Sequence, residues 1–302
     1  MSRGASLTGV IPGDARLSAE PDFAALKGWG RLWAFLRAAA FVALFVGASI
    51  GINVVLHRAL GPNATMGVFY SNILLASATL AITFIMSLIA RRPFGAYGLG
   101  GAHRGRNFFI GTIAGVALLA GLLASLNFAG VFTFGVPDGD PQAIASYAAL
   151  YAIMFLAVAL NEEALFRGFV LIEFGHAISF WPAALILAAL FGVPHALNEG
   201  PAGIVGGSEA ALFALVAAYT LRVTGSLWLI IGLHFGWDYA ETFLFGVPDS
   251  GLVLPGGLMH PLIHGPDWLT GGSAGPEGSV LCTIPVLLMA LLAWALRRRA
   301  SA

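Results

Sequence analysis

Charged and polar side chains interrupt apolar segments at four places in the second half of this sequence. In chain order these places are Asn161-Glu162-Glu163 with Arg167, then His195, then His234 with Asp238, and finally Glu241. Glu163 and Arg167 are four residues apart, so on a helix they share a face and can pair. His234 and Asp238 have the same spacing. The segments therefore bring carboxylates, imidazoles and a guanidinium into apolar surroundings.

This combination of side chains is suited to hydrolysis by an activated water. Peptide hydrolysis needs a base that takes a proton from water, and a donor or cation that faces the oxyanion. A carboxylate in an apolar setting can serve as the base, and a histidine can hold the water or donate to the oxyanion. The chemistry is thus compatible with a metal-free, glutamate-dependent site.

A divalent metal such as zinc could instead activate the water, with a glutamate as base. The ligands expected for such a cation are Glu162, His195, His234 and Asp238. The sequence contains no H-E-x-x-H motif, and its single cysteine, Cys282, excludes a cysteine-based zinc site. The residues leave both mechanisms open, and no other cofactor is expected.

The elements that carry these residues must be membrane helices. The chain has 302 residues, of which 58% are hydrophobic and 10% are charged, whereas soluble proteins carry about 25% charged residues. Residues 68–90 and 107–134 contain no charge, and runs of this length can cross the roughly 30 Å hydrocarbon core as helices. This composition excludes a cytosolic enzyme, a DNA-binding protein and a secreted disulfide-stapled domain.

Apolar runs bounded by charges, glycines and prolines predict an all-α polytopic membrane protein of about eight transmembrane helices around a buried polar cavity. The predicted limits are 32–56, 68–90, 107–130, 143–173, 179–197, 207–222, 225–245 and 279–296. A polar cytoplasmic tail is expected over residues 1–31, a single transmembrane domain over 32–296, and a basic cytoplasmic tail over 297–302. Residues 245–278 form the only long predicted loop.

Basic residues orient these helices. With a cytoplasmic N-terminus, Arg58 is the only one of the 15 lysines and arginines that falls outside, as the positive-inside rule requires. The prediction is a multi-pass cell-membrane protein with both termini in the cytoplasm. Its expected partners are the lipid bilayer and a membrane-bound protein or peptide substrate, with no nucleic acid. The excess of arginine over lysine indicates a GC-rich bacterial genome, and hence a bacterial inner membrane.

Helical rise places the polar residues at similar depths. At 1.5 Å per residue, Glu162 lies about 16 Å from the cytoplasmic end of the fourth predicted helix. His234 and Asp238 lie about 13 and 20 Å along the seventh, and His195 about 24 Å along the fifth. These depths agree within the tilt of the helices, so we expect the residues to line one cavity.

Three motifs resemble those of the CPBP intramembrane endopeptidases, also called ABI, the family of CAAX prenyl proteases and bacteriocin-processing proteins. N-E-E-A-L-F-R-G-F at Asn161–Phe169 resembles the family's E-E-x-x-x-R motif. F-G-V-P-H at Phe191–His195 matches F-x-x-x-H, and H-F-G-W-D at His234–Asp238 matches H-x-x-x-N/D. Each motif is weak alone, but their order on three helices is specific. The resemblance covers a core of about residues 143–245.

The resemblance implies a role for each motif residue. Glu162 would be the general base that polarises the water together with His195, and Glu163 would pair with Arg167. His234 and Asp238 would stabilise the oxyanion. Asp238 departs from the family's pattern, because its best-understood members carry asparagine there and an ionised aspartate cannot donate a hydrogen bond. Asp238 must therefore be protonated, orient His234 or help to hold a cation.

Structural roles are the alternatives for the same residues. Arg167 can snorkel to the membrane interface, His195 can bond to a backbone carbonyl at a helix end, and His234 with Asp238 can be a structural pair. At the level of function, the alternatives to an endopeptidase are a non-proteolytic membrane partner or immunity factor, and a proton-coupled transporter. The lack of an evident internal repeat counts against the transporter.

Several residues outside the motifs have simpler interpretations. Glu241 either lines the cavity or lies at the membrane interface. His260 and His264 have a ligand-like spacing, but Pro261 and their place in the long loop favour solvent exposure. Glycines in the first and third predicted helices indicate close helix packing: Gly51, Gly111, Gly115 and Gly121.

Overall fold

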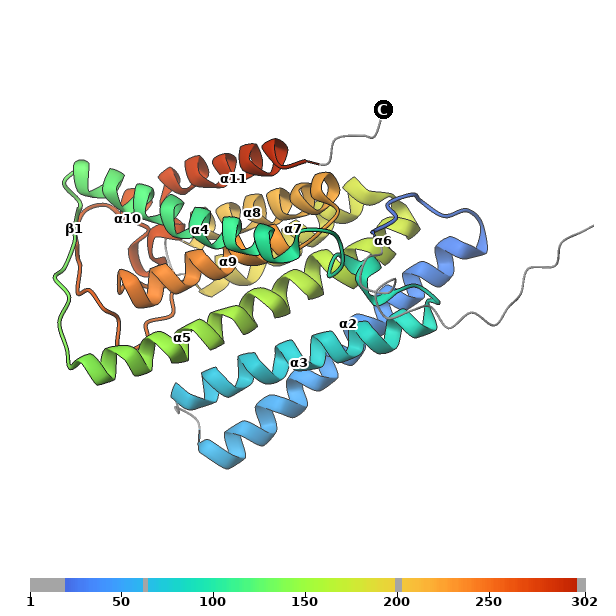
Figure 1. Cartoon of the computed structure of the whole chain (residues 1–302), viewed down its shortest axis with the longest axis horizontal. Helices are drawn as coiled ribbons and strands as arrows, with labels where there is room; N and C mark the ends of the chain where they lie inside the picture. The colour runs from blue at the N-terminus through green and yellow to red at the C-terminus, as the bar shows by residue number, and fades with distance from the viewer. Residues whose placement is uncertain (1–19, 62–64, 199–202, 298–302) are drawn as a thin grey trace, which may run out of the picture.

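A computed structural model of the chain describes residues 20–61, 65–198 and 203–297. Its long helices run lengthwise through an elongated bundle, and the short strands and α10 gather at one end of it (Figure 1). Most of the predicted N-terminal tail and the last residues of the C-terminal tail lie outside the described residues. The tail assignments therefore stay predictions.

Helices form in all eight predicted regions. The first three are α2 (Trp29–Leu60), α3 (Thr65–Ile89) and α4 (Arg104–Phe128). The fourth region begins as α5 (Pro141–Glu162), continues through the π-helix η2 (Glu163–Phe169) and ends as α6 (Val170–Ile178). The others are α7 (Phe180–Asn198), α8 (Gly203–Thr224), α9 (Trp228–Tyr239) with the π-helix η4 (Ala240–Leu244), and α11 (Thr283–Ala295).

Short elements connect these helices. The 3-10 helix η1 (Phe94–Tyr97) joins α3 to α4. Strands β1 (Phe132–Thr133) and β2 (Leu262–Ile263) pair antiparallel, with Phe132 opposite Ile263. The long loop before α11 also holds α10 (Asp267–Thr270) and three 3-10 turns, η5 (Gly272–Ala274), η6 (Pro276–Gly278) and η7 (Val280–Cys282).

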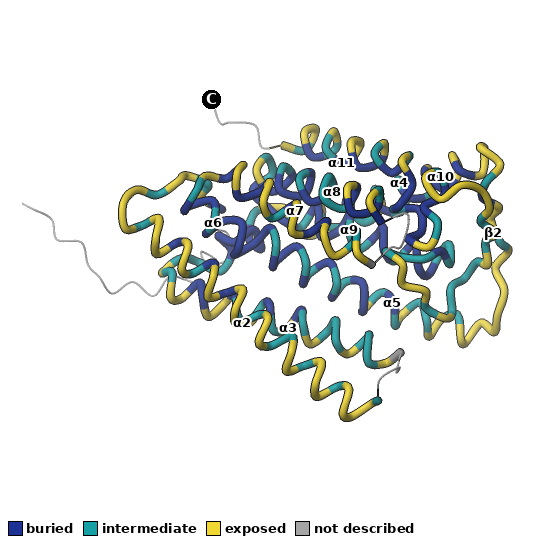
Figure 2. The backbone as a smooth tube through the Cα atoms, turned by 180° about the vertical axis from the view of Figure 1, so that it is seen from behind, coloured by how far each residue is buried: buried dark blue, intermediate teal, exposed yellow. Residues whose placement is uncertain are grey.

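The prediction of an all-α polytopic membrane protein is confirmed, and the number of spans remains approximate. Within the described residues, six helical stretches are long and apolar enough to cross a membrane, whereas α9 and α11 are shorter. Figure 2 shows that α2 is largely exposed along its outer side and that the middle of the bundle is buried. Exposed apolar helices of this kind face lipid in a membrane.

Glycines seat α9 directly against α4. A Cβ atom on Gly232 would lie 2.1 Å from the carbonyl oxygen of Phe108, and one on Gly236 would lie 2.3 Å from that of Thr112. On the α4 side, Gly111 and Gly115 are equally close to the backbone of α9. Such close approach is typical of helix pairs in membranes. Because His234 lies between Gly232 and Gly236, this packing fixes the position of the histidine.

The packing prediction is correct for only two of the four glycines. A Cβ atom added to Gly51 or Gly121 would meet no atom within 4 Å. Their helices therefore do not approach a neighbour closely at these residues. Sequence spacing identifies a small-residue stripe on a helix, but the partner helix decides which part of that stripe is used.

The segment before α2 packs on the bundle over its described part. The Phe23 ring meets the Phe180 ring edge-on at 5.1 Å, and the guanidinium of Arg222 lies 4.8 Å from the Phe23 ring centre. The backbone N–H of Leu26 donates to the carbonyl of His176. Helix α2 also begins three residues earlier than expected, at Trp29.

Candidate active site

Side chains from three helices converge on one cavity of about 250 Å³. Glu162 reaches it from the end of α5, His195 from α7, and His234 with Asp238 from α9. The cavity also has an apolar wall that includes Phe155, Phe213 and Met289. The structure thus brings together residues that are up to 76 positions apart in the chain.

Glu162 and Glu163 point to different surroundings although they are neighbours in sequence. The side chain of Glu162 is 30% exposed and lines the cavity, whereas that of Glu163 is fully buried. The helix changes here from α to π geometry, since α5 ends at Glu162 and η2 begins at Glu163. π-Helical turns are frequent at functional sites. Only Glu162 of this pair is open to a water or substrate in the cavity.

Glu163 joins the first motif to the third. One of its carboxylate oxygens, Oε1, lies 3.3 Å from the Arg167 guanidinium and 2.9 Å from Nδ1 of His234. A carboxylate can only accept hydrogen bonds, so Nδ1 of His234 carries a proton. The other ring nitrogen, Nε2, then faces Glu162 at 3.8 Å and Asp238 at 3.4 Å. Glu163 therefore fixes which nitrogen His234 presents to the cavity.

Arg167 lies in an aromatic cage rather than at the membrane interface. Its side chain is 2% exposed, and its guanidinium carbon lies 4.3 Å from the ring centre of Phe191 and 5.6 Å from that of Phe213. Cation–π contacts of this kind strengthen when water is excluded. The snorkelling interpretation of Arg167 is therefore wrong. Phe213 belongs to no motif, and nothing in its sequence surroundings points to this role.

His195 combines a backbone hydrogen bond with exposure to the cavity. Its Nδ1 lies 2.8 Å from the carbonyl oxygen of Phe191, one helical turn earlier. Because a carbonyl can only accept, Nδ1 carries the proton and the neutral ring keeps a lone pair on Nε2. The phenylalanine of the F-x-x-x-H motif thus has two contacts, since its carbonyl orients His195 and its ring lies under Arg167.

Four further residues have definite places. Asn161 accepts a hydrogen bond from Thr79 Oγ1 at 2.6 Å, which ties α3 to the end of α5. Glu241 is fully buried and does not line the cavity, so the cavity-lining interpretation is wrong and the interfacial position stays a prediction. His260 and His264 are exposed, as expected for the long loop.

The family comparison covers the segment that builds this cavity. The family model described as type II CAAX prenyl endopeptidase Rce1-like matches residues 144–240. Residues 144–240 are thus similar to Rce1-like CAAX endopeptidases. No curated protein and no solved structure matches the chain. The match confirms the resemblance that the three motifs indicate, and the apolar helices are those of a multi-pass membrane protein.

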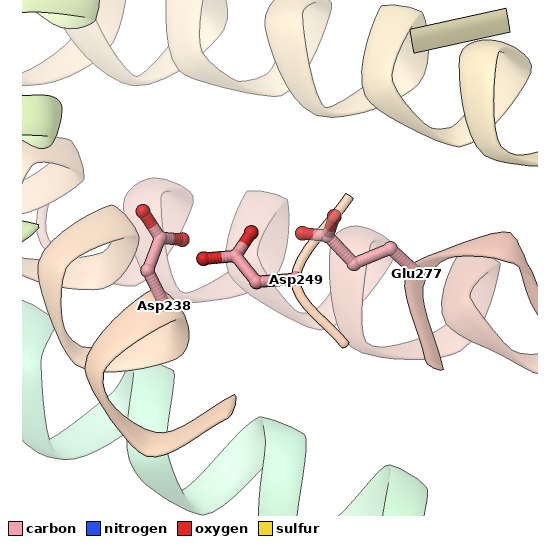
Figure 3. Close-up of side chains that lie close together, drawn as sticks. All are labelled: Asp238, Asp249 and Glu277. Carbon is pink, nitrogen blue, oxygen red and sulfur yellow. The ribbon is translucent and has the colours of Figure 1, made fainter. Parts of the chain in front are cut away.

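The matched segment ends before two acidic residues that complete one wall of the cavity. Asp249 follows η4 and Glu277 lies in η6, and both line the cavity together with Asp238. One carboxylate oxygen from each of the three lies within 4.8 Å of the others. Figure 3 shows the three carboxylates side by side, each from a different stretch of chain. Their separation in sequence, inside a Gly- and Pro-rich loop, gives no motif that could have predicted the cluster.

The four residues expected to bind a metal do not form such a cluster. One cavity is lined by all four residues, Glu162, His195, His234 and Asp238. Among the described residues, however, the group whose ligand atoms come within 4.8 Å of one another is Asp238, Asp249 and Glu277. An oxygen-only donor set differs in chemistry from the mixed histidine and carboxylate set expected from the sequence.

Proposed function

We propose that the Rce1-like domain hydrolyses a peptide bond of a membrane-associated or lipid-modified protein, using a water activated by Glu162 and His195. The observation that carries this proposal is the convergence of Glu162, His195 and His234 on one cavity within the membrane domain. Glu162 is the accessible carboxylate of the E-E pair, which suits it to proton transfer.

In this mechanism Glu162 is the general base and His195 holds the water. His195 donates a hydrogen bond from Nδ1 to the Phe191 carbonyl, which leaves Nε2 to accept a hydrogen bond from the water. Glu162 removes the other proton as the water oxygen bonds to the scissile carbonyl carbon. When the C–N bond breaks, Glu162 returns that proton to the leaving amine.

His234 is placed to stabilise the oxyanion. As an imidazolium it donates from Nδ1 to Glu163 and directs its Nε2–H into the cavity. Preorganised donors of this kind stabilise the charge that develops on the carbonyl oxygen. Asp238 lies 3.4 Å from Nε2, so we assign it the task of orienting and charging His234 rather than donating to the oxyanion. Glu163 and Arg167 act as positioning residues.

A zinc ion is the second candidate for water activation. Two imidazoles and a carboxylate suit zinc, and a carboxylate bound to Nδ1 is typical of histidines that ligate zinc through Nε2. Glu162, His195, His234 and Asp238 would hold it, and it would supply a bound water that ionises near neutral pH. We place this route second because the ligand atoms of these residues do not gather around one point.

We further propose that both termini lie in the cytoplasm of a bacterial inner membrane. The distribution of lysine and arginine supports this orientation. It puts the loop over 245–278, which carries Asp249 and Glu277, on the opposite side. Reporter fusions at residue 297 and within 245–278 should report opposite sides, and the same side at both positions would overturn this orientation.

The decisive experiment compares protein termini in membranes that contain the wild type or Glu162→Gln at matched expression. Glu20→Gln is the control, because Glu20 is exposed and does not line the cavity. We expect new termini with the wild type and the control but not with Glu162→Gln. Identical termini in all three, with Glu162→Gln folded, would overturn proteolysis and favour the non-proteolytic partner or the transporter.

A further inference from the structure

Three carboxylates meet at the cavity wall where the long loop folds back on α9. Asp238 is 4% exposed, and Asp249 and Glu277 are half-buried. Their nearest oxygens lie within 4.8 Å of one another (Figure 3). Like charges at this distance repel strongly when water is partly excluded.

The described residues supply little positive charge to this cluster. Within the described part of the chain, the one ion-pair contact to the three carboxylates is that of Asp238 with His234. Asp249 receives a long hydrogen bond of 3.5 Å from the Thr242 hydroxyl, and Glu277 receives one from the Ser250 hydroxyl. One imidazole therefore faces three carboxylates, and that imidazole also contacts both glutamates of the first motif.

A fourth carboxylate, that of Glu241, lies beside the cluster. Glu241 is fully buried, and neither of its carboxylate oxygens has a hydrogen-bond partner in the described structure. It follows Asp238 by three residues, so the two share a helical face. Its electrostatic neighbours are Glu277, Asp249 and Asp238, the three members of the cluster, and the Trp237 side chain, which is the one neighbour that favours the charged form. A buried carboxylate without a partner is costly, and this one points to a missing positive charge.

We propose that Asp238, Asp249 and Glu277 bind a divalent cation of the Ca²⁺ type. The donor atoms are all oxygens, which suit Ca²⁺ and Mg²⁺ rather than zinc. Ca²⁺ tolerates irregular geometry, whereas Mg²⁺ demands a near-ideal octahedron. Ligands from α9, from the turn after η4 and from η6 form an irregular set, which favours Ca²⁺. This site is distinct from the water-activating residues and shares only Asp238 with the motif region.

The cation would connect the long loop to the proposed catalytic histidine. Asp249 and Glu277 belong to the segment between α9 and α11, and Asp238 contacts Nε2 of His234. Binding would hold this segment against the cavity and neutralise charge next to His234. The site can be tested by binding alone, so it does not depend on the proposed proteolytic activity.

The test is calcium binding to the full-length protein, purified in detergent and freed of metals with a chelator. Isothermal titration with CaCl₂ should show one site per chain in the wild type. Asp249→Asn and Glu277→Gln should each weaken binding by about tenfold or more, since even second-shell residues contribute about 10–100-fold to metal affinity. Asp267→Asn is the control, because Asp267 is an exposed aspartate in the same loop.

Each result decides the proposal. Loss of binding in Asp249→Asn and Glu277→Gln with unchanged binding in Asp267→Asn supports the site. Tighter binding of MgCl₂ than CaCl₂ would keep the site and replace the ion. Absence of saturable binding by the wild type, or equal affinity in all variants, would overturn it.

A second measurement needs no variant and covers the case in which the substitutions prevent folding. The wild type is digested with an added protease in the presence of CaCl₂ or of a calcium chelator. Calcium should slow cleavage between residues 245 and 278, because the bound ion holds this segment against α9. Equal cleavage rates under both conditions would overturn the proposal.

Discussion

His234 donates from Nδ1 to Oε1 of Glu163 over 2.9 Å, across 71 residues of sequence. The same oxygen of Glu163 lies 3.3 Å from Arg167. One buried carboxylate thus connects the E-E-x-x-x-R motif of η2 to the H-x-x-x-D motif of α9. This connection orients His234 so that Nε2 faces Glu162 and Asp238 in the cavity.

Removal of the Glu163 carboxylate should destabilise the protein as well as inactivate it. Glu163→Met leaves Arg167 as an unpaired buried charge, which costs about 3–5 kcal/mol. The double variant Glu163→Met with Arg167→Met removes both charges and should regain most of that stability. Thermal unfolding in detergent measures the difference. A double variant as unstable as Glu163→Met would show that the ion pair is not the source of the loss, and one that regains activity would contradict the positioning role.

Arg167→Lys should lower stability and turnover although it keeps the positive charge. The guanidinium is planar and stacks on Phe191, whereas an ammonium is compact and strongly hydrated. We expect a loss of up to about 2 kcal/mol of stability, the size of a desolvated cation–π contact, together with reduced turnover. Arg106→Lys is the matched control, because Arg106 is exposed. If the two variants have the same unfolding temperature and the same cleavage rate, the aromatic cage around Arg167 is contradicted.

Gly236→Ala should disturb the active site from outside it. Its Cβ would lie 2.3 Å from the carbonyl oxygen of Thr112, so α9 must move away from α4 and carry His234 with it. Overpacking of this kind typically costs about 1–3 kcal/mol. Gly121→Ala is the control on α4, because its Cβ would meet no atom within 4 Å. Gly236→Ala should have a lower unfolding temperature and slower cleavage than Gly121→Ala. Equal values for the two variants would contradict the close α4–α9 contact.

Zinc content separates the two routes of water activation. In the metal-free route we expect the purified protein to contain no stoichiometric zinc and to keep its activity in 1,10-phenanthroline. Elemental analysis of the wild type and of His195→Ala measures the first point. Stoichiometric zinc in the wild type that is lost in His195→Ala would overturn the metal-free route and leave proteolysis itself intact.

Calcium affinity should increase as the pH rises. The pKa of Asp249 is raised by burial and by Asp238 and Glu277, while His234 opposes this shift and Glu162 adds to it. Protons therefore compete with the cation until the pH exceeds this raised pKa. Titrations with CaCl₂ at several pH values measure the trend, which Asp249→Asn should weaken. An affinity that does not change with pH would contradict the participation of Asp249.

The same raised pKa fixes the sign of the effect on stability. Without calcium, folded Asp249 holds its proton more tightly than the unfolded chain does. Its contribution to the free energy of unfolding is therefore largest in acid and is lost as the pH rises through the folded pKa. Added calcium should restore stability at the higher pH, and thermal unfolding with and without calcium measures this. A calcium-free protein that is more stable at the higher pH than in acid would contradict the charge balance assigned to the cluster.

The sequence by itself determined the helices and the motif residues of this protein. Long uncharged runs must lie in the membrane as helices, because backbone groups in lipid have no other partner. Charged and polar residues inside such runs are costly in a membrane and therefore indicate a functional site. This cost singled out Glu162, His195, His234 and Asp238. The four-residue spacing of Glu163 and Arg167 was also enough to predict their contact.

The tertiary structure alone decided what surrounds these residues. The two adjacent glutamates differ in exposure because different neighbours pack around them, and Phe213 reaches Arg167 from α8. Asp249 and Glu277 join Asp238 through the path of an irregular loop, which has no hydrophobic periodicity to reveal it. Local spacing determines which side chains share a helix face, but contacts between distant segments depend on how the helices and loops pack.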